Sequence, residues 1–215
     1  MVNILRWFDQ LKRHDRSLKI LIGLNIFMAI ASNIVDYPWL ASVKWYLLPL
    51  TPICSLYPLT LAIWFTIYRQ KKTVPPWYTT FILMGIIGYG IMAQVYYPFY
   101  MSWDGVTWRY IGNMIWVAIY ASQALTLKSE IKKLPPIQYL LIFGYFALKD
   151  YADRYLGTFL DILRPDFPQW HIDLLFPLLL TVHILAALWI LKTAFYSKVS
   201  QVEAVAASGV TTGAN

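Results

Sequence analysis

Hydrophobic residues in this chain form long stretches with few polar interruptions, and short polar segments separate most of them. Six stretches have the length of a membrane-spanning helix. They cover residues 18–34, 45–68, 77–97, 107–127, 137–155 and 172–196. In lipid, a helix is favoured because it satisfies its own backbone hydrogen bonds. The pattern therefore predicts an all-α integral membrane protein, a bundle of six transmembrane helices.

Composition agrees with a chain that lies mostly in lipid. Hydrophobic residues make up 59% of it and charged residues 13%, whereas soluble domains carry about 25% charged residues. The start lacks the short apolar core and small-residue cleavage site of a signal peptide. We expect a basic N-terminal segment at 1–17, a membrane domain at 18–196 and a flexible polar tail at 197–215.

The positive charges indicate an orientation. Most of the 18 lysines and arginines lie in residues 1–19, 69–72, 128–133 and 192–198. These segments fall on one side of a six-helix topology, and cytoplasmic loops are the ones enriched in Lys and Arg. We expect both termini to be cytoplasmic. Because the charge is spread over short loops rather than gathered in one basic stripe, nucleic-acid binding is excluded as a function class.

The second apolar stretch differs from the others. Three prolines interrupt it: Pro49, Pro52 and Pro58. Proline lacks a backbone N–H and disfavours a straight helix, so the freed carbonyls need partners, which Thr51, Ser55 or buried water can supply. We expect a kinked helix, or a partly re-entrant loop before a helix that begins near Ile53. The broken helix of a transporter site is the alternative.

A dense charged group ends the fifth stretch, with Lys149, Asp150, Asp153 and Arg154. Asp150 lies about 20 Å along a helix from Ile137, which places the carboxylates at or just inside the outer membrane edge. Charges four residues apart can neutralise each other on one helix face. Alternatively, the group faces an outer vestibule that relays protons, holds a cation or docks a basic partner. That vestibule would also contain Asp36, Asp104, His171 and Asp173.

Few polar residues interrupt the remaining stretches. His183 falls near the middle of the sixth, where a neutral imidazole bridging helices or a proton-binding role are both consistent with the pattern. Asn25 lies in the first, and Gly85, Gly88 and Gly90 give the third a small-residue face for close helix packing. We find no catalytic motif, and no second membrane histidine that would complete a haem site, so we expect neither enzyme activity nor a cofactor.

These residues resemble a YpjA-like family of small multi-helix membrane proteins of unknown function in bacteria and archaea. The resemblance is carried by the following residues: Asn25, Pro49, Pro52, Ser55, Leu56, residues 122–125, Lys149, Asp150, Asp153, Arg154 and Gly157. Lysine and arginine replace the asparagine and tyrosine of the family's aspartate motif. The resemblance would also lead us to expect a histidine near that motif and another in the fourth stretch. Both are absent here: Leu148 lies near the motif and Asn113 lies in the fourth stretch.

Genes of this family tend to lie beside those of cytochrome bc-type complexes. The resemblance thus implies a non-catalytic subunit or assembly factor of a respiratory electron-transfer complex in a prokaryotic plasma membrane. Its partners would be lipid and other membrane subunits, including haem-containing ones. The residues themselves leave two alternatives open. One is a small-solute or proton transporter that uses the acidic vestibule, and the other is a lipid-modifying enzyme with interfacial carboxylates.

Overall fold

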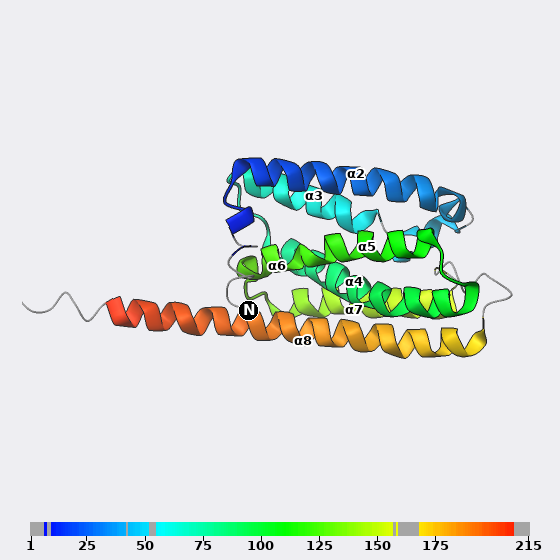
Figure 1. The fold of residues 1–215 in the computed structure, drawn as a ribbon. Coiled ribbons are helices and arrows are strands. Elements are labelled where there is room, and N and C mark those ends of the chain that lie inside the picture. The colour runs from blue at the N-terminus through cyan, green and yellow to red at the C-terminus, as the bar shows by residue number, and fades with distance from the viewer. Residues whose placement is uncertain are drawn as a thin grey trace, which may run out of the picture.

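The structure is a computed structural model that describes Trp7 and residues 10–41, 43–51, 55–156, 158 and 168–208. For residues 35–39, 172 and 196–208 it describes the backbone alone. This part of the chain is all-α, as predicted, with seven α-helices and two short 3-10 helices (Figure 1). The elements are α2 (Asp15–Leu40), η1 (Trp45–Leu50), α3 (Leu56–Arg69), α4 (Pro76–Asp104), α5 (Trp108–Ser122), α6 (Ala124–Leu127), η2 (Lys128–Glu130), α7 (Pro136–Tyr155) and α8 (Gln169–Ser208).

The long helices run along one common direction, each antiparallel to the next, with α4 in the interior of the bundle (Figure 1). Helix α4 packs against α3, α5, α7 and α8, and α2 lies against α3 at one side. Helix α2 begins and α8 ends at the same end of the bundle. That end carries the basic segments for which we predicted a cytoplasmic location.

Three helices of the described chain are long and apolar enough to cross a membrane, over Asp15–Ile34, Pro76–Asp104 and Gln169–Phe195. They indicate a multi-pass membrane protein. The other predicted spans differ for identifiable reasons. Helix α3 has 14 residues, about 21 Å, because the first part of the second stretch forms η1 instead. Helix α7 has 20 residues but carries the charged group at one end.

Several boundaries differ from the sequence prediction. The second stretch divides into η1 and α3, which begins at Leu56, while Pro52 and Ile53 lie outside the described residues. The fourth stretch bends at Gln123 between α5 and α6. Helix α8 continues to Ser208, into the tail that we expected to be flexible, because the segment 201–207 consists mainly of residues that a helix tolerates well, Ala, Gln and Glu among them.

Side chains on the bundle surface are those expected in contact with lipid. Helix α2 exposes Ile26, Phe27 and Ile30, and α8 exposes Leu185 and Leu188. In contrast, the interior holds many of the polar residues of the apolar stretches, some of them charged. Buried polar and charged residues within an apolar core, beneath an apolar surface, fit a protein whose solvent is the bilayer.

The close helix packing predicted at the three glycines of α4 is present, but the glycines do not form a single face, because each contacts a different helix. A Cβ atom on Gly85 would lie 1.9 Å from the Tyr57 ring of α3. On Gly88 it would lie 2.1 Å from Nε2 of His183 in α8, and on Gly90 it would lie 2.4 Å from Ala121 of α5. Helix α4 can therefore pack this closely against its neighbours only because these positions lack side chains.

Candidate functional site

Charged and polar side chains from three helices meet inside the bundle. Helix α7 contributes Lys149, Asp150 and Asp153, because residues three and four apart share one helix face. Tyr89 comes from α4 and His183 from α8. Lys149 and Asp150 are completely buried, and Asp153 and His183 nearly so. We call these five residues the charged cluster.

The cluster lies deep in the bundle. Tyr89 is about 20 Å from the start of α4 and about 22 Å from its end. His183 is about 21 Å from the start of α8, measured in the same way along the helix axis. Tyr89 thus lies near the middle of α4, and its distance from the start of that helix matches the value of about 20 Å that counting along the fifth stretch gives for Asp150.

A carboxylate and an imidazole form the closest contact of the cluster. Nδ1 of His183 lies 2.7 Å from Oδ2 of Asp150, so one proton is held between them. The opposite ring atom, Nε2, is buried without a hydrogen-bond partner among the described residues and faces the Cα of Gly88. The rings of Tyr89 and Phe146 flank the imidazole at 5.1 Å each, centroid to centroid. This packing fixes the orientation of the ring toward Asp150.

The second carboxylate is linked to the first through a phenol. The Tyr89 hydroxyl lies 3.4 Å from Oδ1 of Asp150 and 3.4 Å from Oδ2 of Asp153. The Thr158 hydroxyl donates a 2.6 Å hydrogen bond to Oδ1 of Asp153. A short displacement of the phenol toward either carboxylate therefore changes which of them accepts its hydrogen bond.

Lys149 connects the cluster to the irregular second stretch. Its ammonium donates a 3.0 Å hydrogen bond to the Leu50 carbonyl and lies 4.7 Å from the centroid of the Tyr89 ring. It is also within electrostatic range of the Asp153 carboxylate. One helical turn earlier, the Tyr145 hydroxyl donates to the Pro49 carbonyl at 2.6 Å. Side chains of α7 thus satisfy two carbonyls at the end of η1.

We expected Thr51 to donate to a carbonyl freed within this stretch. Its hydroxyl donates to the Leu47 carbonyl. The prolines have different positions. Pro49 lies inside η1, and Pro58 lies in the first turn of α3, where the missing N–H has no helical acceptor to lose. Pro52 falls outside the described residues.

The formal charge of the cluster is unbalanced. Lys149 contributes one positive charge and the two aspartates contribute two negative charges, so a neutral His183 leaves one net negative charge. Burying an uncompensated charge costs several kcal/mol. One additional proton, on the imidazole or on a carboxyl group, makes the cluster neutral. The arrangement is therefore suited to holding one exchangeable proton inside the bundle.

Other residues predicted for an outer vestibule lie apart from this cluster. Arg154 pairs with Asp173 at 2.6 Å, partly exposed, rather than with Asp150. Asp104 accepts a 2.5 Å hydrogen bond from the Tyr110 hydroxyl. The side chain of Asp36 lies outside the described residues, as does Gly157.

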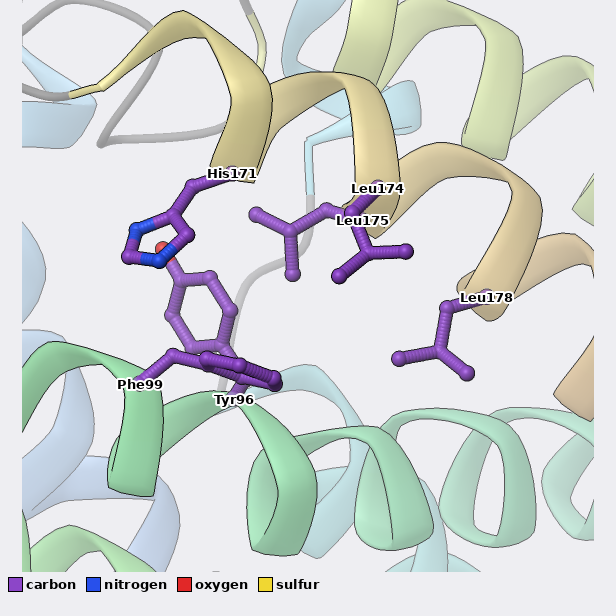
Figure 2. A pocket seen from close by; sticks show the side chains of 6 residues that line it. All are labelled: Tyr96, Phe99, His171, Leu174, Leu175 and Leu178. Carbon is purple, nitrogen blue, oxygen red and sulfur yellow. The ribbon is translucent and has the colours of Figure 1, made fainter.

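His171 lines a crevice between α4 and α8 (Figure 2). The empty volume of this crevice is about 240 Å³, with the open space at its mouth included, yet the crevice is too narrow to hold a water molecule. The lining residues are Tyr96, Phe99, His171, Leu174, Leu175 and Leu178. Figure 2 shows the imidazole above the Tyr96 and Phe99 rings, with the leucines continuing along α8. The crevice is almost entirely apolar.

A second buried polar contact is neutral. Nδ2 of Asn25 donates to Oε1 of Gln123 at 2.7 Å and to the Leu21 carbonyl at 2.8 Å, and Nε2 of Gln123 donates back to Asn25 at 3.4 Å. Both side chains are buried. This amide pair joins α2 to the bend between α5 and α6.

Sequence reasoning missed three side chains around the cluster, namely Tyr89, Tyr145 and Thr158. Each is a polar residue in or beside an apolar stretch, and such positions are common enough that composition alone does not single them out. Gly88 signalled a close approach, but the group that approaches it is His183, so it did not point to these three residues. Within the described residues, no group of three or more His, Cys, Asp or Glu side chains is placed to hold a metal ion.

Comparisons with protein-family models, curated proteins and solved structures find no match to this chain. The resemblance to the YpjA-like family stays a prediction. Functional inference therefore rests on the geometry of the site.

Proposed function

We propose that the protein is a proton-coupled transporter or channel in which Asp150 and His183 form the proton-binding centre. The observation that carries this proposal is their 2.7 Å contact inside a cluster whose charged side chains are buried. In this proposal α2, α3, α4, α5 with α6, α7 and α8 all cross the membrane, and the two ends lie in the cytoplasm. Ionisable residues at such depth commonly mark ion pathways and proton relays.

A purely structural role explains the cluster less well. Buried ion pairs are weak evidence for stability, because apolar residues of similar volume often stabilise a fold as much or more. The amide pair joins helices in the same bundle without any charge. The cluster instead combines two carboxylates, an ammonium and an imidazole, a set whose charge changes with each proton it takes up. These chemical properties favour proton exchange.

Proton flux across liposomes is the direct test. The purified chain is reconstituted with a pH-sensitive dye inside and a potassium diffusion potential across the membrane. We expect Asp150→Asn and His183→Gln to lower the proton flux about tenfold or more, the size of effect that loss of a proton-transfer group produces in catalysis. Asp173→Asn is the matched control, since Asp173 is a partly exposed aspartate outside the cluster, and we expect it to retain the flux.

Equal fluxes from the wild type, Asp150→Asn and His183→Gln would contradict the proposal. So would a loss of flux in Asp173→Asn as large as that in Asp150→Asn. Correct folding of each variant is checked by its elution profile and helical content before reconstitution.

The role as a subunit or assembly factor of a respiratory complex stays a prediction that the sequence resemblance alone carries. Gentle purification from native membranes tests it separately. Recovery with haem-containing cytochrome subunits in fixed ratio would support it, and recovery of a colourless protein alone would contradict it. The lipid-modifying alternative has no residue arrangement in its favour beyond the carboxylates themselves.

A further inference from the structure

The 3-10 helix η1 is attached to the bundle by a small number of contacts. None of its residues is buried, and Trp45 and Tyr46 are largely exposed. It packs against α7, where Tyr145 and Lys149 donate to its last two carbonyls. These two side chains are four residues apart and therefore lie on one face of α7.

Within the described chain, these two side chains are the donors that the two carbonyls have. Helix η1 ends at Leu50, and the next internal hydrogen bond runs from the Thr51 amide to Leu48, so among the described residues the Pro49 and Leu50 carbonyls accept from the two side chains of α7. In a bilayer, an unsatisfied backbone group costs several kcal/mol. Loss of either α7 donor therefore loosens the end of η1.

One of the two donors, Lys149, contacts η1 and is also a member of the charged cluster. The Lys149 ammonium binds the Leu50 carbonyl, and it is the one lysine or arginine among the five residues of the charged cluster. Titratable groups surround the Lys149 ammonium on several helices. Helix α7 contributes Asp150, Asp153 and Tyr145. The neighbouring helices contribute Tyr89 of α4, His183 of α8 and Tyr57 of α3.

We propose that Lys149 and Tyr145 form a latch that holds η1 on α7, and that protonation of the charged cluster releases it. This inference rests on the proposed function and deepens it, since it assigns η1 as the proton-controlled gate. With both carboxylates ionised, the ammonium is stabilised by their charge. When the cluster takes up further protons, the ammonium is left without a counter-charge in an apolar interior, which is strongly unfavourable. It then moves toward water, and the Leu50 carbonyl loses its donor.

Hydrogen exchange of η1 in lipid nanodiscs tests the latch in the full chain. The readout is the protection factor of the backbone amides in residues 45–51, corrected for the intrinsic exchange rate at each pH. In the wild type, we expect protection to fall about tenfold or more between about pH 8 and pH 5, the range in which histidine and perturbed carboxylates change charge. Hydrogen bonds to charged groups contribute enough to account for that change.

Three variants separate the parts of the latch. Lys149→Met should show low protection at both pH values. Asp153→Asn removes one negative charge while keeping an acceptor for Thr158, so fewer protons are needed to leave the ammonium without a counter-charge, and protection should fall at a higher pH than in the wild type. Tyr145→Phe removes only the hydroxyl, so we expect lower protection but the same pH dependence as the wild type. This variant also keeps the test informative if Lys149→Met fails to fold.

Wild-type protection in Lys149→Met or in Tyr145→Phe would overturn the latch. A wild type whose η1 protection does not change with pH would overturn the protonation control. Either result leaves the proton-flux experiment unaffected, so failure of the latch and failure of the proposed function are distinguishable. Exchange in the interior of α2, which carries none of the five residues of the charged cluster, serves as the internal reference and should not change with pH.

Discussion

The charged cluster and the amide pair are two buried polar contacts in one bundle, and they differ in kind. Asn25 and Gln123 are neutral and donate to each other. The cluster holds three formal charges, and its histidine keeps one ring nitrogen without a hydrogen-bond partner in the described chain. The amide pair shows that neutral groups suffice to join helices here. The charges of the cluster therefore call for a further explanation, which proton exchange supplies.

The difference is also energetic. Hydrogen bonds between membrane helices contribute about 0.6 kcal/mol on average and about 1.7 kcal/mol at most. Removing one partner from a buried charged pair leaves an uncompensated charge and costs about 3–5 kcal/mol. Substitutions in the two regions should therefore differ in magnitude and in pH dependence.

The largest effect is expected from Lys149→Met. This change leaves two buried carboxylates without their counter-charge, and we expect the free energy of unfolding at neutral pH to fall by about 3–5 kcal/mol. Reversible unfolding in mixed detergent micelles measures it. The double variant Lys149→Met with Asp153→Leu removes a negative charge as well and should recover part of the loss. Two losses that simply add would contradict the electrostatic coupling.

A smaller loss is expected from Gly88→Ala. The new methyl group would lie 2.1 Å from Nε2 of His183, so the imidazole or the two helices must move. Overpacking of this kind costs about 1–3 kcal/mol, and it should also weaken the contact of His183 with Asp150. Gly144→Ala is the matched control, because nothing lies within 4 Å of its Cβ position. Equal stability of the two variants would show that α4 and α8 are not in this contact.

Asn25→Ala should have a modest effect that does not depend on pH. It removes hydrogen bonds between neutral amides, so we expect a loss of about 0.6–1.7 kcal/mol in the free energy of unfolding. The same micelle experiment at two pH values measures it. A pH-dependent loss would mean that the amide pair is coupled to the charged cluster, and the contrast between the two regions would fail.

The smallest effect is expected from Asp173→Asn. Its pair with Arg154 is partly exposed, and such pairs contribute about 0–1 kcal/mol. The loss should shrink further as salt is added, because salt screens exposed charges. A loss of several kcal/mol that persists in high salt would instead place this pair in the same class as the cluster.

The sequence predicted the helical class correctly, and it also indicated which charged residues of α7 share a helix face, because both depend on local patterns. Lengths of apolar stretches indicate helices, and the spacing of Lys149, Asp150 and Asp153 puts them on one face. The partners of that face could not be predicted. His183 lies 33 residues from Asp150 in the chain and Tyr89 lies 61 residues away, and their meeting depends on the rotation of α4 and α8 about their axes.

The second stretch shows a different limit. Its apolar length is compatible with one membrane-spanning helix, yet the chain forms η1 and a shorter α3. The prolines indicated an interruption, but η1 receives hydrogen bonds from Tyr145 and Lys149 of α7, about 100 residues further along the chain. Local propensity carries no information about such distant donors.

Infrared difference spectroscopy between neutral and acidic pH tests the central claim most directly, because protonated carboxyl groups absorb apart from carboxylates. The account predicts a band from a buried carboxyl group that the wild type and Asp173→Asn share. In Asp150→Asn with Asp153→Asn this band should be absent. If the double variant keeps the same band as the wild type, the charged cluster does not exchange protons and the account is contradicted.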